Sequence, residues 1–275
     1  SFSKSDMECL LTYWQVILLA IVHGVTEFVP ISSSGHLVLF RNWFNWSDQS
    51  GLVIDTILHA GSLTALLIYF WREWKAIIHA YFSTSDPAFS SYRRLPWLLV
   101  VATIPVVIAG SILKPFLAEG QIVRNNVITG LSMMMTAFFY WLAERRFTPE
   151  DKPVGFPQAI FIGCMQIIAL LPGASRSGWT TGAGMLSGYK REASVRFAFF
   201  MAIPAIAGAV IFQVRDIIAS CITDFDPLLA GTGFIVSFLI SLSAIHLCLL
   251  YFRAHSLKIF SIYLAIIGLL AVLVG

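Results

Sequence analysis

The sequence predicts an all-α integral membrane protein, with six transmembrane helices and two re-entrant helix-loop-helix hairpins in an inverted-topology repeat. Three observations lead to this prediction. The 275 residues are 57% hydrophobic and only 12% charged, whereas soluble domains carry about 25% charged residues. Long apolar segments recur along the whole chain. Two of these segments are interrupted by polar turns, one in each half of the sequence.

Charge and cysteine content exclude several other classes of protein. The 18 basic and 15 acidic residues give a net charge of +3, which provides no basic field for nucleic acid. The four cysteines include no C-x-x-C pair, so neither a zinc ribbon nor a dithiol redox site is indicated. We therefore expect a single membrane domain over residues 1–275 that does not bind nucleic acid. Whether it forms a homo-oligomer stays open.

Six segments are long and apolar enough to span a bilayer. A helix needs about 20 residues to cross the hydrocarbon core. The segments that meet this requirement are residues 52–73, 95–114, 124–143, 193–214, 227–251 and 257–274.

Two further apolar segments are interrupted before they could cross. Residues 10–29 end at Pro30 and the polar run 32–36, and residues 156–171 end at Pro172 and the polar run 175–178. A short helix-forming stretch follows each interruption, at 36–45 and at 179–188. Irregular backbone is not tolerated where lipid surrounds it. Each segment is therefore predicted to turn back as a re-entrant hairpin whose tip is buried in protein.

The two interruptions can be aligned with each other. Placing Ser32 on Ser175 shifts the chain by 143 residues, and the same shift places His23 on Gln166. Each half, about residues 8–145 and 155–275, then holds one hairpin and three spans. Because three is odd, the halves are predicted to have opposite orientations in the membrane. Broken helices of such inverted repeats meet near the midplane and form the functional site.

Basic residues predict the orientation of the chain. With both termini facing outward, the inner segments hold 12 Lys and Arg residues and the outer segments hold 5. Short cytoplasmic loops are enriched in Lys and Arg. We therefore expect both termini on the outer side of the membrane.

The second tip carries an arginine inside the membrane. Arg176 lies between Ser175 and Ser177, at the expected start of the 179–188 helix. Its planar guanidinium suits phosphate or carboxylate oxygens, and free N–H groups at a helix N-terminus favour an anion. An intramembrane arginine marks a functional site by default, so we predict an anion site here. In the alternatives, Arg176 reaches one membrane face or only neutralises Glu27.

The first tip gathers a carboxylate, hydroxyls and imidazoles. Such a set can activate a hydroxyl for attack on phosphorus or protonate a leaving group. Glu27 with His23 could also hold a divalent metal. In the alternative, the serines only cap a helix and Glu27 only neutralises Arg176. Asp55 and His59, on the next span, are expected to orient these groups rather than react. The residues at the tip are His23, Glu27, Ser32, Ser33, Ser34 and His36.

Other phosphate-processing motifs are missing. The sequence contains no G-x-x-x-x-G-K-[ST] loop and no H-E-x-x-H motif. Ser34-Gly35-His36 is similar to part of the signature of acid-phosphatase-type lipid phosphatases. That type also needs a histidine at the position where Gly182 stands, which argues against it.

At both tips the sequence resembles the undecaprenyl pyrophosphate phosphatase family, also called the bacitracin resistance protein family. The resemblance spans nearly the whole chain and includes Asp55, His59 and Gly61-Ser62 between the two motifs. The first motif is matched by Gly24, Thr26, Glu27, Phe28, Pro30, Ser32, Ser33, Ser34 and His36, and the second by Pro172, Gly173, Ser175, Arg176, Ser177, Gly178 and Thr180.

The resemblance implies a location, an activity and a site. The family has the fold described above and lies in the bacterial inner membrane, with both termini expected to be periplasmic. It removes the terminal phosphate of undecaprenyl diphosphate, which recycles this lipid carrier for cell-wall synthesis, and it uses a divalent cation such as Mg²⁺ or Ca²⁺. By resemblance Arg176 holds the diphosphate, Ser33 is the candidate nucleophile, and Glu27 and His36 are acid, base or metal partners. The resemblance leaves open whether serine or histidine attacks. Further expected substrate-binding residues are His23, Ser32, Ser34, Gln166, Ser175, Ser177 and Thr180.

Position 23 departs from the family pattern, which has Glu or Gln there. His23 can be neutral, charged or metal-bound, so an altered dependence of activity on pH or on the metal ion is predicted.

A rival function also stays open, because broken inverted repeats suit a carrier of undecaprenyl phosphate or another anionic lipid equally well. The combination of Ser33, Glu27 and His36 favours an enzyme, since a carrier needs no nucleophile.

Overall fold

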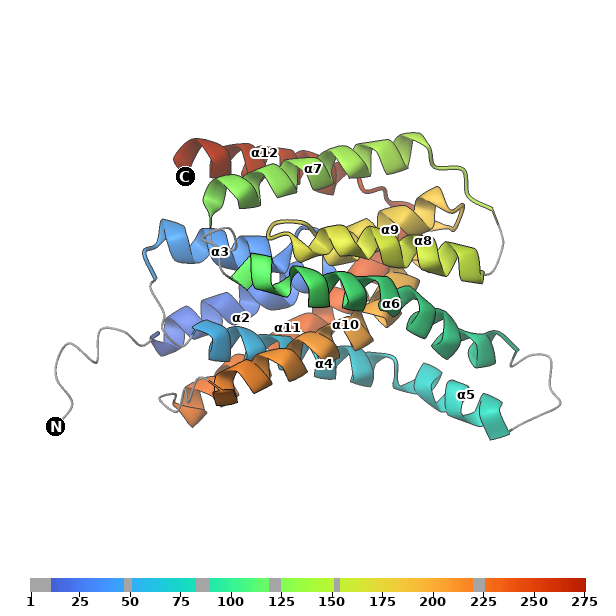
Figure 1. Cartoon of the computed structure of the whole chain (residues 1–275), viewed down its shortest axis with the longest axis horizontal. Coiled ribbons are helices and arrows are strands. Elements are labelled where there is room, and N and C mark those ends of the chain that lie inside the picture. The colour runs from blue at the N-terminus through green and yellow to red at the C-terminus, as the bar shows by residue number, and fades with distance from the viewer. Residues whose placement is uncertain (1–10, 47–50, 83–89, 119–124, 151–153, 220–225) are drawn as a thin grey trace.

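The computed structural model describes residues 11–46, 51–82, 90–118, 125–150, 154–219 and 226–275. Every regular element within these ranges is a helix, and most helices run along the long axis of the molecule (Figure 1). The elements in chain order are α2 (Tyr13–Phe28), α3 (Ser33–Trp43), α4 (Gly51–Tyr69), α5 (Trp71–Phe82), α6 (Ser90–Ala118), α7 (Asn126–Arg145), α8 (Phe156–Gln166), the 3-10 helix η3 (Ile167–Leu170), α9 (Arg176–Leu186), α10 (Arg191–Ala219), α11 (Pro227–Ala254) and α12 (Lys258–Val274).

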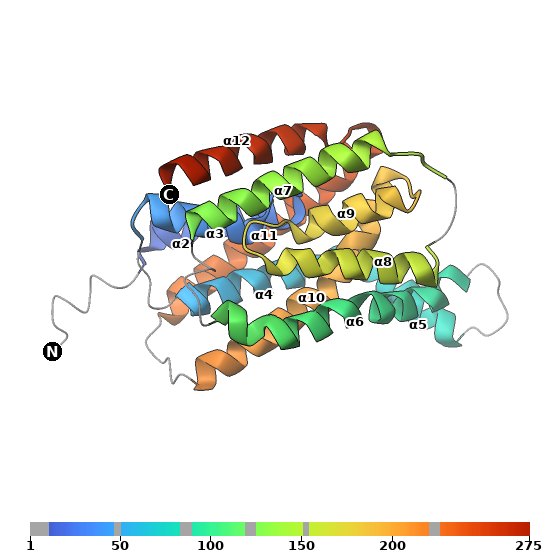
Figure 2. The same cartoon turned by 45° about the horizontal axis from the view of Figure 1, so that its top comes forward.

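Five helices in the described part of the chain are long and apolar enough to cross a membrane. They are α4, α6, α7, α10 and α11, so the chain is a multi-pass membrane protein of the all-α class. The segment predicted as the sixth span, 257–274, forms α12, which is apolar but has 17 residues. It packs along α7 on one side of the molecule (Figures 1 and 2).

The segment predicted as one span over 52–73 is divided in the structure. α4 ends at Tyr69 and α5 begins at Trp71, and the two helices diverge at Phe70 (Figure 1). Phe70 is fully buried, and its ring packs against Phe200 with 4.7 Å between ring centroids. Neither glycine nor proline marks this position in the sequence. The long-range contact with Phe200 accompanies the break, and local sequence patterns cannot show such a contact.

The two interrupted segments fold as helical hairpins. The α2–α3 hairpin enters from the end where α12 terminates, and the α8–η3–α9 hairpin enters from the opposite end (Figures 1 and 2). Their tips meet in the interior. A Cβ atom added to Gly35 would lie 2.9 Å from the Cα atom of Gly173 in the other tip. The hydroxyl of Tyr140, on α7, donates to the Pro30 carbonyl at 2.7 Å.

The two tips start their second helices in the same way. Ser32 precedes α3 and its Oγ accepts from the Gly35 N–H at 3.2 Å. Ser175 precedes α9 and its Oγ accepts from the Gly178 N–H at 3.2 Å. Each serine is therefore an N-cap that satisfies one free N–H group. Ser32 has a φ of 73°, a strained conformation for a non-glycine residue, and such strain clusters at functional sites.

Close packing between the second tip and α7 yields a test of stability. A Cβ atom on Gly178 would lie 1.4 Å from the hydroxyl of Tyr140, which is fully buried. Gly178→Ala is therefore expected to lower stability by at least ~1–3 kcal/mol, the range typical of overpacked cores. Thermal unfolding in detergent measures this. Gly231→Ala, on α11, is the control, because its Cβ would meet nothing within 4 Å. An equal melting temperature for both variants would contradict the packing seen here.

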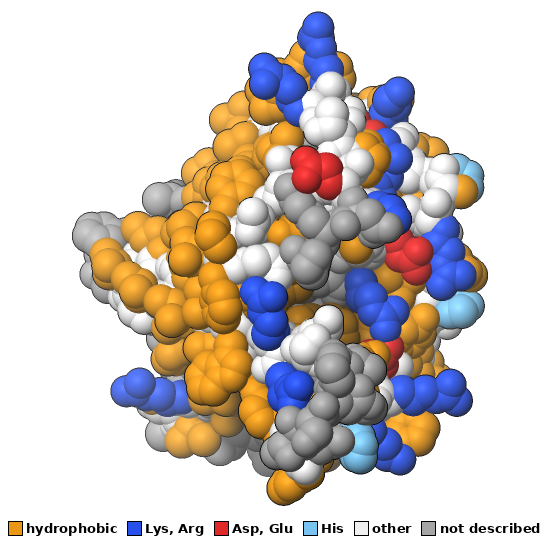
Figure 3. Space-filling model, turned by 90° about the vertical axis from the view of Figure 1, so that its right-hand side faces the viewer, with side chains coloured by type: hydrophobic (Ala, Val, Ile, Leu, Met, Phe, Trp, Pro, Cys, Tyr) orange, Lys and Arg blue, Asp and Glu red, His pale blue; other side chains and the backbone are white. Residues whose placement is uncertain are grey.

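Basic side chains gather at the end from which the α8–η3–α9 hairpin enters. Figure 3 looks onto this end and shows Lys and Arg side chains spread across it. Among the residues that the structure describes, ion pairs at this end join Arg191 to Glu144, Arg196 to Glu73 and Arg253 to Glu192. The opposite end holds the pair of Arg41 with Asp55.

Candidate active site

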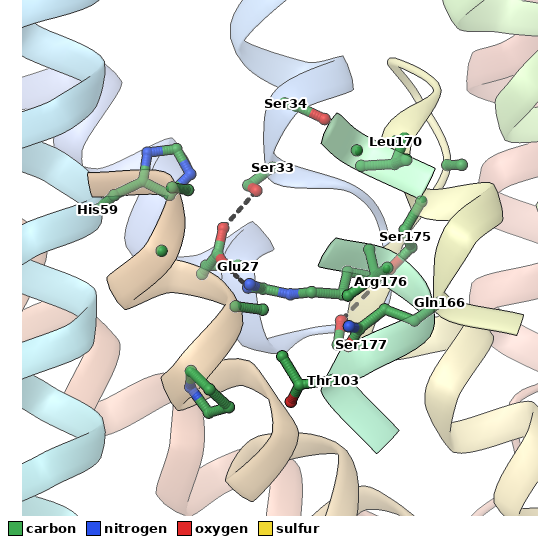
Figure 4. Close-up of a pocket in the computed structure, with 18 of the residues that line it drawn as sticks. Glu27, Ser33, Ser34, His59, Thr103, Gln166, Leu170, Ser175, Arg176 and Ser177 are labelled. Carbon is green, nitrogen blue, oxygen red and sulfur yellow. Dashed lines mark hydrogen bonds and ion pairs between the residues drawn. The ribbon is translucent and has the colours of Figure 1, made fainter. Parts of the chain in front are cut away.

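A cavity of about 580 Å³ lies where the two tips face α4, α6 and α10. One part of its wall is polar and comes from the hairpins (Figure 4). Another part is apolar and is formed by side chains of α6, η3 and α10, including Val107, Leu170 and Phe212. The polar wall consists of Thr26, Glu27, Ser32, Ser33, Ser34, Gln166, Ser175, Arg176 and Ser177.

Three side chains form a continuous polar connection between the tips. Ser33 Oγ donates to Glu27 Oε2 at 2.5 Å, and Arg176 forms an ion pair with Glu27 Oε1. In Figure 4 the Glu27 carboxylate is approached by Ser33 from one direction and by Arg176 from another. The Glu27 side chain is 3% exposed and the Arg176 side chain 22% exposed. A buried carboxylate needs such a partner, because removing one member of a buried ion pair leaves a costly charge.

The local structure of each tip explains these positions. Glu27 is the penultimate residue of α2, which ends where Pro30 follows. Ser33 and Arg176 are the first residues of α3 and α9. Both helix N-termini thus face one cavity, where their N–H groups and positive dipole ends favour an anion. The Arg176 Nε atom is buried and has no hydrogen-bond partner among the described residues.

Gln166 adds a second unsatisfied polar group to the cavity. It is the last residue of α8, is 1% exposed and lines the cavity. Neither atom of its amide has a partner within the described ranges. An unpaired buried amide costs about 1–3 kcal/mol. Such a cost is offset when a bound ligand or water supplies the hydrogen bonds.

Two histidines lie beside Glu27. His59, on α4, lines the cavity, and its Nδ1 lies 2.7 Å from the Asp55 carbonyl oxygen. His23, on α2, is fully buried and its ring centroid lies 4.6 Å from that of His59. One ligand atom each from His23, Glu27 and His59 lies within 4.8 Å of the others. This group could hold a divalent metal.

The donor set can be compared with the divalent cation, Mg²⁺ or Ca²⁺, that the family resemblance implies. Mg²⁺ and Ca²⁺ prefer oxygen ligands, and only Glu27 supplies oxygen in this group. The other two donors are imidazole nitrogens, which suit zinc and other transition metals. The three side chains therefore fit a metal, but not the all-oxygen environment that Mg²⁺ or Ca²⁺ prefers.

The side chains of His36 and Thr180, which were predicted to be in the site, and of Asp55, which was predicted to support it, point away from the cavity. His36 Nδ1 donates to the Ser32 carbonyl and its Nε2 accepts from the Tyr263 hydroxyl, both at 2.7 Å. Thr180 donates to the Arg176 carbonyl at 2.8 Å. The Asp55 carboxylate pairs with Arg41 at 2.7 and 2.8 Å. None of the three lines the cavity.

These three residues instead stabilise the tips through hydrogen bonds and an ion pair outside the cavity. His36 ties the strained Ser32 turn to α12, and Thr180 fixes the first turn of α9. Asp55 anchors α3 to α4 through Arg41, and its backbone carbonyl oxygen accepts from His59. The remaining predicted substrate-binding residues Ser32, Ser34, Gln166, Ser175 and Ser177 all line the cavity, whereas His23 lies beside it.

Sequence reasoning missed the residues that neighbouring helices contribute. Tyr140 holds the first tip by its bond to Pro30, and Tyr263 holds His36. Thr103 and Phe212 complete the wall from α6 and α10. Each lies in an apolar run and resembles an ordinary core or lipid-facing residue, so the sequence offered no signal that could have found it.

Known proteins resemble this chain over almost its entire length. The family described as bacitracin resistance protein BacA matches residues 16–270. Proteins named undecaprenyl-diphosphatase are similar in Alteromonas mediterranea (37% identity, covering 94% of this chain and 97% of that protein), Thermomicrobium roseum (35%, 95% and 97%) and Methanosphaera stadtmanae (35%, 97% and 99%). The chain, with its two hairpin tips meeting at one buried cavity, therefore belongs to the bacitracin resistance protein BacA family.

Proposed function

We propose that this chain is a membrane phosphatase that removes the terminal phosphate of undecaprenyl diphosphate and so recycles the lipid carrier for cell-wall synthesis. Relatives at 35–37% identity bear the name undecaprenyl-diphosphatase. The observation that carries the proposal is the Ser33–Glu27–Arg176 connection, which joins a hydroxyl, a carboxylate and a guanidinium at one cavity.

The second tip would bind the terminal phosphate. Arg176 offers a planar fork for phosphate oxygens, and the N-terminus of α9 adds N–H groups and a positive dipole end. Ser175 and Ser177 line the same wall. In the free protein Arg176 is held by Glu27. A bound phosphate competes for the guanidinium and leaves Glu27 free to accept a proton.

The first tip would carry out the chemistry. Ser33 Oγ attacks the terminal phosphorus while Glu27, already its hydrogen-bond partner at 2.5 Å, takes the proton. The bond from phosphorus to the bridging oxygen breaks, and the lipid monophosphate leaves. Water then hydrolyses the phosphoserine and releases inorganic phosphate. A general base within hydrogen-bond reach of a hydroxyl is the arrangement that activates weak nucleophiles.

The apolar wall of the cavity would hold the start of the isoprenoid. Val106, Val107, Leu170 and Phe212 line the same cavity as the polar groups. Apolar side chains bind a hydrocarbon chain, and the few polar groups fix the orientation of the head. The cavity therefore suits an amphiphile with a phosphorylated head.

We further propose the complete membrane topology. α12 is the sixth span, the two hairpins are re-entrant, and the halves form an inverted repeat in the bacterial inner membrane. The matching N-caps at Ser32 and Ser175 and the entry of the hairpins from opposite ends support this. The basic end in Figure 3 would face the cytoplasm by the positive-inside rule. The end at which α12 terminates, and with it the termini, would face the periplasm.

Gln166→Leu tests the polar wall of the cavity. Leucine has a similar size and removes an amide that has no partner among the described residues, so the melting temperature should stay equal or rise. If the amide binds substrate, kcat/KM should fall about 10- to 100-fold, the worth of one or two hydrogen bonds to a charged group. Gln158→Leu, at the other end of α8, is the matched control. Unchanged kinetics in Gln166→Leu would remove this residue from the site.

The experiment that tests the function is phosphate release by purified protein in detergent. Undecaprenyl diphosphate is supplied with and without a divalent cation, and undecaprenyl phosphate is the control substrate. We expect inorganic phosphate from the diphosphate only. A folded protein that releases no phosphate but moves undecaprenyl phosphate between the leaflets of liposomes would instead establish the carrier function.

A further inference from the structure

His23 is a buried histidine that no hydrogen bond within the described part of the chain explains. The residue is fully buried, and neither Nδ1 nor Nε2 has a partner among the described residues. An unpaired buried polar atom costs about 1–3 kcal/mol. Its ring meets that of His59 at an interplanar angle of 66°. Packing alone therefore gives no reason for an imidazole at this position.

His59 has the hydrogen bond that metal-bound histidines usually have. Its Nδ1 lies 2.7 Å from the backbone carbonyl of Asp55. Because a carbonyl only accepts, Nδ1 carries the proton and Nε2 carries a free lone pair. Histidine ligands of metals generally donate their other N–H group to a carbonyl or carboxylate in this way, which fixes the tautomer. His59 is thus prepared to donate from Nε2.

We propose that His23, His59 and Glu27 form a binding site for a divalent transition metal such as Zn²⁺ or Mn²⁺, in preference to Mg²⁺ or Ca²⁺. The inference rests on the proposed function, because Glu27 would both bind the metal and accept the proton of Ser33. Two imidazoles and one carboxylate are a donor set that suits these metals. The histidine at position 23, where the family pattern has Glu or Gln, supplies the nitrogen that changes the preference.

The three side chains need to move only slightly to bind one metal ion. Ligand atoms that share one ion at about 2.1 Å lie roughly 3–4 Å apart, and here they lie within 4.8 Å. Arg176 does not occupy the same space, since Figure 4 shows His59 on the far side of Glu27 from Arg176. The carboxylate can therefore bind a metal from one side and the guanidinium from the other. Metal and arginine together would add positive charge that a diphosphate neutralises.

The test measures binding of the metal itself. Purified protein without an affinity tag is stripped with a chelator and titrated with Co²⁺, whose visible absorption reports nitrogen and oxygen ligation. Competition by Zn²⁺, Mn²⁺, Mg²⁺ and Ca²⁺ then ranks the ions. His23→Gln and His59→Gln each remove one nitrogen donor. His246→Gln is the control, because His246 lies on α11 and contacts Tyr69 rather than the cluster.

The proposal predicts one Co²⁺ per chain, displaced by Zn²⁺ at least about 100-fold more effectively than by Mg²⁺. His23→Gln and His59→Gln should each weaken Co²⁺ binding about 100-fold or more, and His246→Gln should not. Absence of a bound-cobalt spectrum, or equal binding by His23→Gln and wild type, would overturn the site. If phosphate release with Mg²⁺ survives such a result, the phosphatase stands without this metal. If Co²⁺ binds as expected and no phosphate is released, the metal site stands and the proposed function fails.

Discussion

Replacing Arg176 with lysine is expected to lower kcat/KM for undecaprenyl diphosphate by about 100-fold or more. Lysine keeps the charge that neutralises the buried Glu27 carboxylate, so the protein should still fold. It loses the planar fork that binds two phosphate oxygens at once. Removing one positioned donor from a site that stabilises developing charge costs about 100- to 1,000-fold. The loss should appear in kcat as well as in KM, because charge develops on the phosphate oxygens.

Steady-state kinetics in detergent measure this effect. Arg253→Lys is the matched control, because its pair with Glu192 lies at the basic end and its side chain is 60% exposed. That variant should have wild-type kinetics. The melting temperatures of both variants show whether folding has changed. Equal kinetics for Arg176→Lys and wild type would mean that the guanidinium does not contact the substrate.

Replacing Ser33 with alanine is expected to lower kcat by at least about 1,000-fold, as the loss of a nucleophile does in other hydrolases. The folded state should be little affected, since only one hydroxyl is removed from the N-terminal turn of α3. Ser34→Ala is the comparison. Ser34 lies on the same tip and lines the same cavity, but its hydroxyl has, among the described residues, only a 3.5 Å contact with the Ser32 hydroxyl. We expect less than a 10-fold effect there.

A single-turnover experiment decides which atom attacks. Substrate labelled in its terminal phosphate is mixed with excess protein and the reaction is stopped with SDS at neutral pH, where both phosphoserine and the acid-labile phosphohistidine survive. Label on the wild-type protein that is absent from Ser33→Ala would identify the phosphoserine. Label that persists in Ser33→Ala and disappears in His36→Gln would assign the attack to His36, despite its contacts with Ser32 and Tyr263.

The two helical hairpins and the polar side chains at their tips could be predicted because local sequence determines them. Proline followed by serines cannot continue a helix in lipid, and both tips lie where Pro30 and Pro172 place them. The predicted span 124–143 forms α7 over Asn126–Arg145, which is close because apolar length determines it. Glu27, Ser33 and Arg176 were expected together, and the structure joins them by a hydrogen bond and an ion pair.

The remaining features depend on contacts between residues far apart in the chain. His36 shares a motif with Ser33, but a hydroxyl 227 residues away in sequence, that of Tyr263, binds its Nε2. The break at Phe70 accompanies packing on Phe200 and not a turn residue. Tyr140 lies in an apolar run like any membrane aromatic, yet it supports the first tip. Periodicity and motifs predict the secondary structure and chemistry of one segment, whereas the contacts of His36, Phe70 and Tyr140 depend on neighbouring helices.

The most direct test of the central claim is a double-mutant cycle across the two tips. Phosphate release is measured for wild type, Glu27→Gln, Arg176→Lys and the double variant, all checked for folding. If Glu27 and Arg176 act as one unit, the double variant should be about as slow as the slower single variant, because groups that act together are strongly non-additive. Losses that multiply would show that the two tips act independently. Phosphate release that is unchanged in either single variant would contradict an active site between the tips.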